Sequence, residues 1–191
     1  MLTANAGQKD NGCIINTVTQ VTSDPNQITL AVNKANLTRD MVAATKKFTV
    51  SILSEAADFS LFQRFGFQSG RDADKFAGFS ATKRVASGAL AVTEGTNGYI
   101  SGWVTQAIDV GTHTLFLASV TDMDVWSNVP SATYAYYQSH IKPKPAARPA
   151  GGKTVWRCKV CGYEYEGEEL PADFICPICK HPASDFEMIG G

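Results

Sequence analysis

The chain has 191 residues, a formal net charge of −1, 44% hydrophobic residues and 18% charged residues. This composition permits a packed core and excludes global disorder, and the charge gives no reason to expect binding to nucleic acid or to an anionic membrane. The sequence contains neither an apolar run of about 18 residues nor a recognisable leader, so we expect a cytoplasmic protein without membrane helices.

The first 140 residues are predicted to be mostly β-strand. Ile28, Leu30 and Val32 alternate with small or polar residues, and the same period of two recurs over 48–53. This alternation of β-branched and aromatic residues is typical of strands. Further β-rich stretches lie at 88–93, 98–109 and 112–121.

Two short helices are predicted among these strands. Thr38 is a candidate N-cap for a helix over 39–47, and a second helix is expected over 55–65, ending at Gly66. The phenylalanines of the second helix recur every three residues and are expected to face the core. Several strands with only two short helices favour a closed or half-closed antiparallel barrel.

The composition changes near residue 141. Residues 142–152 hold three prolines and two glycines without an apolar pattern, which is typical of a semi-rigid linker. We therefore predict a first domain over 1–140, a linker over 141–152 and a small second domain over 153–191.

Four cysteines of the second domain have metal-site spacing. Cys158, Cys161, Cys176 and Cys179 form C-x2-C-x14-C-x2-C, which in a cytosolic chain favours a metal over disulfides. Four tetrahedral thiolates select zinc or iron, and a domain this small needs the metal in order to fold. The fifth cysteine, Cys13, is expected to be a small buried hydrophobic residue.

The second domain resembles rubredoxin. The knuckles C-x2-C-G-Y and C-P-x-C carry the resemblance, and Gly162 after the first knuckle suits a positive φ. The resemblance implies one iron, with a structural zinc ribbon as the alternative. Four Lys/Arg against seven Asp/Glu over 153–191 argue against a nucleic-acid-binding ribbon. Its aromatic core would comprise Trp156, Tyr163, Tyr165, Phe174 and Phe186.

The first domain resembles the flavin reductase-like family. Residues 11–25, 33–38, 64–76 and 109–117 carry this resemblance, which covers nearly all of 1–140. It implies a mainly β fold, namely an FMN-binding split β-barrel with short helices, followed by the small rubredoxin-like metal-binding domain. It also implies a homodimer with FMN between the protomers.

The resemblance implies particular flavin contacts. The ring would lie along Asn16, Thr17 and Val18. The phosphate would bind where a strand meets a helix N-terminus, although ordinary capping explains Thr38 equally well. The expected phosphate residues are Asn33, Lys34, Asn36 and Thr38, with Lys75 as a second charge.

His113 matches a family histidine near the flavin ring or the nicotinamide, and it is our catalytic candidate. Orientation rather than proton transfer would be its role, and a strand histidine without function is the alternative. The sequence has no GxGxxG fingerprint, so NAD(P)H would bind on the flavin. Because family members begin with an additional helix and strand, we expect the first strand of this chain to be truncated, with an exposed barrel edge and impaired flavin binding.

Together the two domains predict a converter from two-electron to one-electron transfer. Electrons would pass from NAD(P)H through FMN to the iron, and then to an acceptor such as a flavodiiron oxygen or nitric oxide reductase. One alternative is a flavin reductase that supplies reduced FMN. The other is a non-enzymatic flavin-binding module with a structural zinc ribbon.

Overall fold

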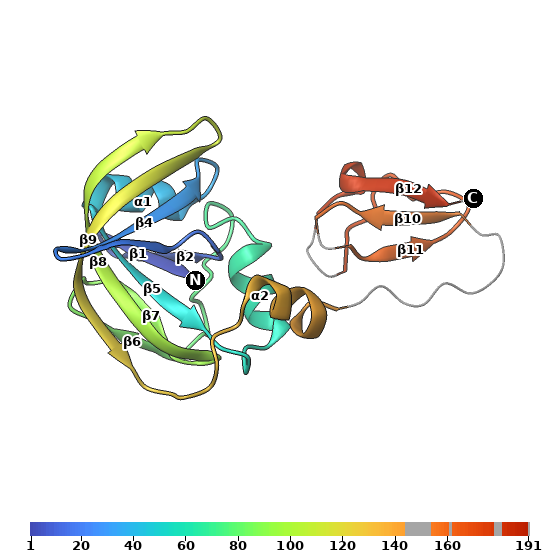
Figure 1. Ribbon diagram of the computed structural model, residues 1–191. Helices are drawn as coiled ribbons and strands as arrows, with labels where there is room; N and C mark the ends of the chain where they lie inside the picture. The colour runs from blue at the N-terminus through green and yellow to red at the C-terminus, as the bar shows by residue number, and fades with distance from the viewer. Residues whose placement is uncertain (144–153, 161, 178–180, 191) are drawn as a thin grey trace. The chain divides into compact units, whose positions relative to one another are not determined.

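The computed structural model describes residues 1–143, 154–160, 162–177 and 181–190. The chain forms two compact units, Met1–Gln138 and Ser139–Gly191 (Figure 1). The domain bounds of 1–140, 141–152 and 153–191 stay predictions, and most of the expected linker lies outside the described residues. Within the described ranges, no helix has the length and apolar character needed to cross a bilayer.

The first unit is built on one antiparallel sheet of seven strands in the order β2-β1-β5-β8-β9-β4-β3. The sheet is strongly curved, and β6 and β7 form a separate hairpin (Figure 1). The mainly β fold is therefore confirmed. The strands are β1 (Leu2–Ala6), β2 (Lys9–Cys13), β3 (Thr19–Ser23), β4 (Asn26–Asn33), β5 (Lys47–Leu53), β6 (Thr82–Arg84), β7 (Leu90–Val92), β8 (Thr96–Asp109) and β9 (His113–Val125).

The predicted alternation in β4 matches its burial. Ile28, Leu30 and Val32 are all at most 3% exposed, and they form the core with residues from the neighbouring strands. Leu30 lies opposite Phe116 of β9 in the register, and Phe116 is fully buried. Phe48 of β5 closes the same core.

Helix α1 (Leu37–Thr45) begins earlier than expected. Its N-cap is Asn36, which is extended, and the Arg39 amide already donates to the Asn36 carbonyl at 3.0 Å. The prediction of Thr38 as N-cap is therefore wrong, because Thr38 lies inside the first turn and is fully buried.

Helix α2 (Phe59–Gly66) starts later than expected, because the Asp58 carboxylate caps it by accepting from the Ser60 amide at 2.8 Å. Phe62 and Phe65 face the core as predicted. A third helical segment was not predicted. It comprises α3 (Tyr134–Tyr136) and one π-helical turn over Tyr137–Ile141.

Strand β1 pairs with β2 on one side and with β5 on the other. The outer strands of the sheet are β2 and β3. The truncation of the first strand stays a prediction.

The second unit contains a small antiparallel sheet in the order β11-β10-β12. Its strands are β10 (Val155–Cys158), β11 (Glu164–Glu166) and β12 (Phe186–Gly190), and a 3₁₀ turn over Ala183–Asp185 precedes β12.

Candidate functional site

The turn between β4 and α1 presents an open helix N-terminus. The Asn33 side chain accepts from the Ala35 amide at 2.9 Å, which closes the turn. Asn36 occupies the N-cap position, but its side chain makes no capping hydrogen bond. Among the described residues, no side chain caps the first amides of α1, and such a terminus attracts anions.

Lys34 links this turn to the tip of the β8–β9 hairpin. Its ammonium contacts both carboxylate oxygens of Asp109 at 2.7 Å, and its amide donates to the Thr112 carbonyl at 3.0 Å. The hydrogen bond from Lys34, supported by the Gly111 amide, lowers the pKa of Asp109. These contacts join the turn before α1 to the hairpin tip and pair the Lys34 ammonium with Asp109.

His113 lies at the same place because it is the first residue of β9 and pairs with Asn33 in the register. Its Nδ1 lies 2.8 Å from the Thr112 hydroxyl. The structure therefore brings His113 close to Asn33 and Lys34, and its expected position near the flavin ring or the nicotinamide stays a prediction.

Thr38 lies inside the first turn of α1, two residues after Asn36. Its hydroxyl accepts from the side-chain amide of Asn11 on β2 at 2.9 Å. Asn11 is only 1% exposed, and its Oδ1 has no hydrogen-bond partner among the described residues. This buried contact anchors the start of α1 to β2.

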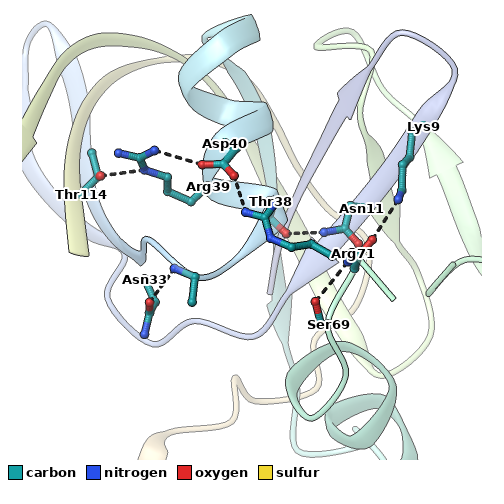
Figure 2. A network of polar contacts seen from close by, with 11 residues as sticks. Lys9, Asn11, Asn33, Thr38, Arg39, Asp40, Ser69, Arg71 and Thr114 are labelled. Atoms are coloured by element: carbon teal, nitrogen blue, oxygen red, sulfur yellow. Dashed lines mark hydrogen bonds and ion pairs between the residues drawn. The ribbon is translucent and has the colours of Figure 1, made fainter. Parts of the chain in front are cut away.

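Three charged residues that meet at the first turn of α1 were not assigned from the sequence (Figure 2). Arg39 donates through Nε to the Thr114 hydroxyl at 2.9 Å and through Nη1 to Asp40 Oδ1 at 3.0 Å. Arg71 donates to Asp40 Oδ2 at 2.5 Å. These hydrogen bonds, chiefly that from Arg71, lower the pKa of Asp40. Neither residue spacing nor periodicity predicts that Arg71 and Asp40 meet, because they are 31 positions apart in the chain.

The segment after β2 holds the predicted ring contacts. The Thr17 hydroxyl donates to the Ala31 carbonyl at 2.7 Å and accepts from the Ala31 amide at 3.1 Å, so it fastens this segment to β4. Asn16 and Val18, on either side, line a cavity of about 690 Å³. Its other walls are largely apolar or aromatic and include Ile14, Ile52, Phe62, Phe67, Ile100 and Tyr137.

Lys75 is 4% exposed, and its ammonium donates to the carbonyls of Gly12 and Phe65 at 3.0 Å each. These bonds join β2 to the end of α2, and burial lowers the pKa of this lysine. Its expected contact with a phosphate stays a prediction. Cys13, also on β2, is 3% exposed, which agrees with its expected role as a small core residue.

In the second unit, the described knuckle residues fit a thiolate metal site. Cys158 and Cys176 are fully buried, and Cys161 and Cys179 lie outside the described residues. Gly162 has the expected positive φ of +79°, and its amide donates to the Cys158 carbonyl at 2.8 Å. The buried sulfurs come from two separate turns, as a metal centre with four cysteine ligands requires.

The expected aromatic core surrounds Phe174. Its ring centroid lies 4.7 Å from that of Tyr165, 5.4 Å from that of Phe186 and 6.4 Å from that of Tyr163. The Trp156 indole nitrogen is buried and has no hydrogen-bond partner among the described residues. Aromatic packing therefore supports the unit alongside the metal site.

Comparison with known proteins gives two family matches. Residues 1–145 match the flavin reductase like domain, and residues 156–187 match the rubredoxin-like domain of rubrerythrins. The high molecular weight rubredoxin of Moorella thermoacetica is 34% identical over 217 residues, covering 99% of this chain and 94% of that protein. The ferric-chelate reductase (NAD(P)H) of Archaeoglobus fulgidus is 35% identical over 144 residues, covering 75% of this chain and 85% of that protein.

Solved structures support the fold of the first unit. The NADH:FAD oxidoreductase of Streptomyces globisporus, in complex with NAD and FAD fragments, superposes with a TM-score of 0.60 and 23% identity, covering 68% of this chain and 75% of that one. Flavoredoxin from Methanosarcina acetivorans superposes with a TM-score of 0.59 and 20% identity, covering 65% of this chain and 66% of that one. At these identities the likeness shows the fold alone, and the predicted fold class is confirmed.

Proposed function

The chain belongs to the flavin reductase-like family, joined to a rubredoxin-like domain, and is an oxidoreductase; we propose that it carries electrons from NAD(P)H through FMN to one iron. The observation that carries the proposal is the presence of both domains in one chain, which a single relative matches almost from end to end. The final acceptor would be a redox protein such as a flavodiiron reductase of oxygen or nitric oxide, and the cytoplasm would be the site of action.

The open N-terminus of α1 supports the placement of the FMN phosphate. Asn36 leaves the first amides of the helix without a side-chain cap, and Lys34 of the same turn is paired with Asp109, from which a phosphate would have to draw it. Amides, dipole and cation together fit a phosphate dianion. Asn33 and Thr38 would support this site indirectly, because the Asn33 side chain closes the turn and the buried Thr38 hydroxyl anchors the first turn of the helix to β2.

The segment at Asn16, Thr17 and Val18 is the proposed support of the flavin ring. The Thr17 hydroxyl is already hydrogen-bonded to β4, so the backbone of this segment and the Asn16 side chain would be the groups that contact a flavin ring. When bound, a flavin supplies hydride acceptance followed by release of single electrons. His113, beside Asn33, would orient the nicotinamide ring.

Iron rather than zinc is proposed for Cys158, Cys161, Cys176 and Cys179, because only iron changes valence. The Gly162 backbone would turn peptide groups toward the sulfurs, and hydrogen bonds of that kind tune the potential of such a centre.

A second copy of the chain is the proposed partner at the β8–β9 hairpin. Trp103, Ile108 and Val110, which are large apolar residues of β8 and the turn after it, are 46–50% exposed. Ile108 and Val110 flank Asp109, the partner of Lys34, so a dimer here would border the proposed phosphate site. Ile108→Glu should convert a dimer to a monomer in mass measurements, and an unchanged mass would contradict this interface.

One anaerobic visible spectrum tests the proposed electron path. The purified full chain should show both flavin and iron–thiolate absorption, and both should bleach on addition of NADH or NADPH. Bleaching of the flavin alone would contradict transfer to the second domain. Stoichiometric zinc in native protein would contradict the proposed iron.

A further inference from the structure

A carboxylate lies in the first turn of the helix whose N-terminus is the proposed phosphate site. Asp40 is the acidic residue in the first turn of α1. A carboxylate at this position stabilises the helix, yet it repels any anion that binds the same helix end. The proposed phosphate site therefore requires that the charge of Asp40 be balanced.

Two arginines supply this balance. Arg39, from the same turn, and Arg71, from the loop after α2, donate to different oxygens of Asp40 at 3.0 and 2.5 Å. Figure 2 shows Arg71 extending from its loop to the first turn of α1. Two guanidinium groups around one carboxylate leave one net positive charge.

The peptide group that precedes Arg71 is held at both its oxygen and its nitrogen. The Gly70 carbonyl accepts from the Lys9 ammonium at 2.9 Å, and the Arg71 amide donates to the Ser69 hydroxyl at 3.1 Å. Gly70 packs so closely on Asn11 that a Cβ would lie 2.3 Å from Asn11 Oδ1. Because Asn11 also binds Thr38, the loop and α1 are held by a second route.

We propose that Arg71 is a positioning residue for phosphorylated flavin, which it serves by holding and neutralising the Asp40 carboxylate at the first turn of α1. The proposal rests on the proposed phosphate site. It assigns Arg71 to the discrimination between FMN and riboflavin, which carry the same ring and differ by the phosphate.

The test is titration of the full chain with FMN and, separately, with riboflavin, followed by flavin fluorescence. The wild type should bind FMN more tightly. Arg71→Gln should raise the Kd for FMN roughly fivefold to tenfold and leave that for riboflavin within about twofold. Adding Asp40→Asn to Arg71→Gln should restore most of the lost affinity for FMN, because the repelling carboxylate is then absent.

Arg84→Gln is the matched control. It breaks the Arg84–Asp10 pair, whose arginine is 52% exposed, against 49% for Arg71. It should change neither Kd.

Two results would overturn the proposal while leaving the phosphate site intact: an unchanged preference for FMN in Arg71→Gln, or no rescue by Asp40→Asn. Equal losses of FMN and riboflavin affinity would show a merely structural role and overturn it as well. Equal affinities of the wild type for both flavins would instead reject the phosphate site itself.

Discussion

The two units hold their candidate sites in place by different means. Beneath α1, Leu30, Val32 and Phe116 are fully buried in a core that consists of the chain's own apolar side chains. Among the described residues of the second unit, the buried apolar positions are Cys158, Cys176 and Phe186, and two of these three are expected metal ligands. We therefore expect the first site to persist without flavin, whereas the second unit needs its metal to fold.

Replacing a knuckle cysteine should have the largest effect. Cys176→Ser removes one of four expected thiolates, so the iron and the fold of the second unit should be lost, while NAD(P)H still reduces the flavin. Metal analysis measures the iron content, and the visible spectrum shows whether NAD(P)H still reduces the flavin. Cys13→Ala, at the buried cysteine outside the knuckles, should leave the metal content unchanged. Loss of flavin reduction in Cys176→Ser would contradict the independence of the units.

A core truncation in the first unit is the reciprocal experiment. Phe116 is fully buried, so Phe116→Ala should lower the free energy of unfolding of this unit by about 3–5 kcal/mol. Denaturant titrations followed by circular dichroism measure this, and iron absorption reports on the second unit. Val125→Ala, at a side chain that is 73% exposed, is the control and should have almost no effect. An equal shift of the iron transition in Phe116→Ala would show that the units unfold together.

The sequence was informative about the two units to different degrees. In the second unit, the cysteine spacing alone predicts metal binding, because each C-x2-C pair brings two thiols together within one turn, independently of the rest of the fold. The prediction of a positive φ at Gly162 was confirmed for this reason. In the first unit, the alternation at Ile28, Leu30 and Val32 identified a strand, but not its neighbours in the sheet.

The α1 site shows where such prediction ends. Thr38 is a good N-cap residue by type, and Asn36, two positions earlier, ranks only slightly higher, so propensity separates them weakly. The choice follows from the turn at the end of β4, where Asn36 is extended and Thr38 instead binds Asn11. The Arg71–Asp40 contact depends on how a distant loop packs against α1, which no local pattern records.

A methyl group at Gly70 should have an intermediate effect. Its Cβ would lie 2.3 Å from Asn11 Oδ1, so the loop has to shift, at a cost of about 1–3 kcal/mol in the free energy of unfolding, and FMN binding should weaken. Gly78→Ala is the control, because its φ of +67° costs about 1–2 kcal/mol while its Cβ meets no atom within 4 Å. It should not affect FMN binding. Equal FMN affinity in both variants would contradict the role of the Gly70 contact.

The smallest expected effect is the pH dependence of the Asp40 contribution. Arg71 and Arg39 hold the pKa of Asp40 below its usual value of 3.8. Because the folded pKa is lowered, this contribution to stability is complete above the unfolded pKa and is lost as the pH falls through the folded pKa. The Arg71 and Asp40 side chains are 49% and 40% exposed, so solvent screening limits the contribution to less than about 1 kcal/mol.

The measurement compares the unfolding free energy of the first unit with and without Asp40→Asn, from about pH 6 to about pH 2.5. Both proteins should carry Cys176→Ser, because acid also protonates the thiolates of a metal site and would add an unrelated transition. The difference between the two proteins should be greatest at the upper end and vanish as the pH falls below the folded pKa of Asp40. A difference that stays constant with pH would mean that Asp40 acts through its shape rather than its charge. The charge-based account of the Arg71–Asp40 pair would then have to be abandoned.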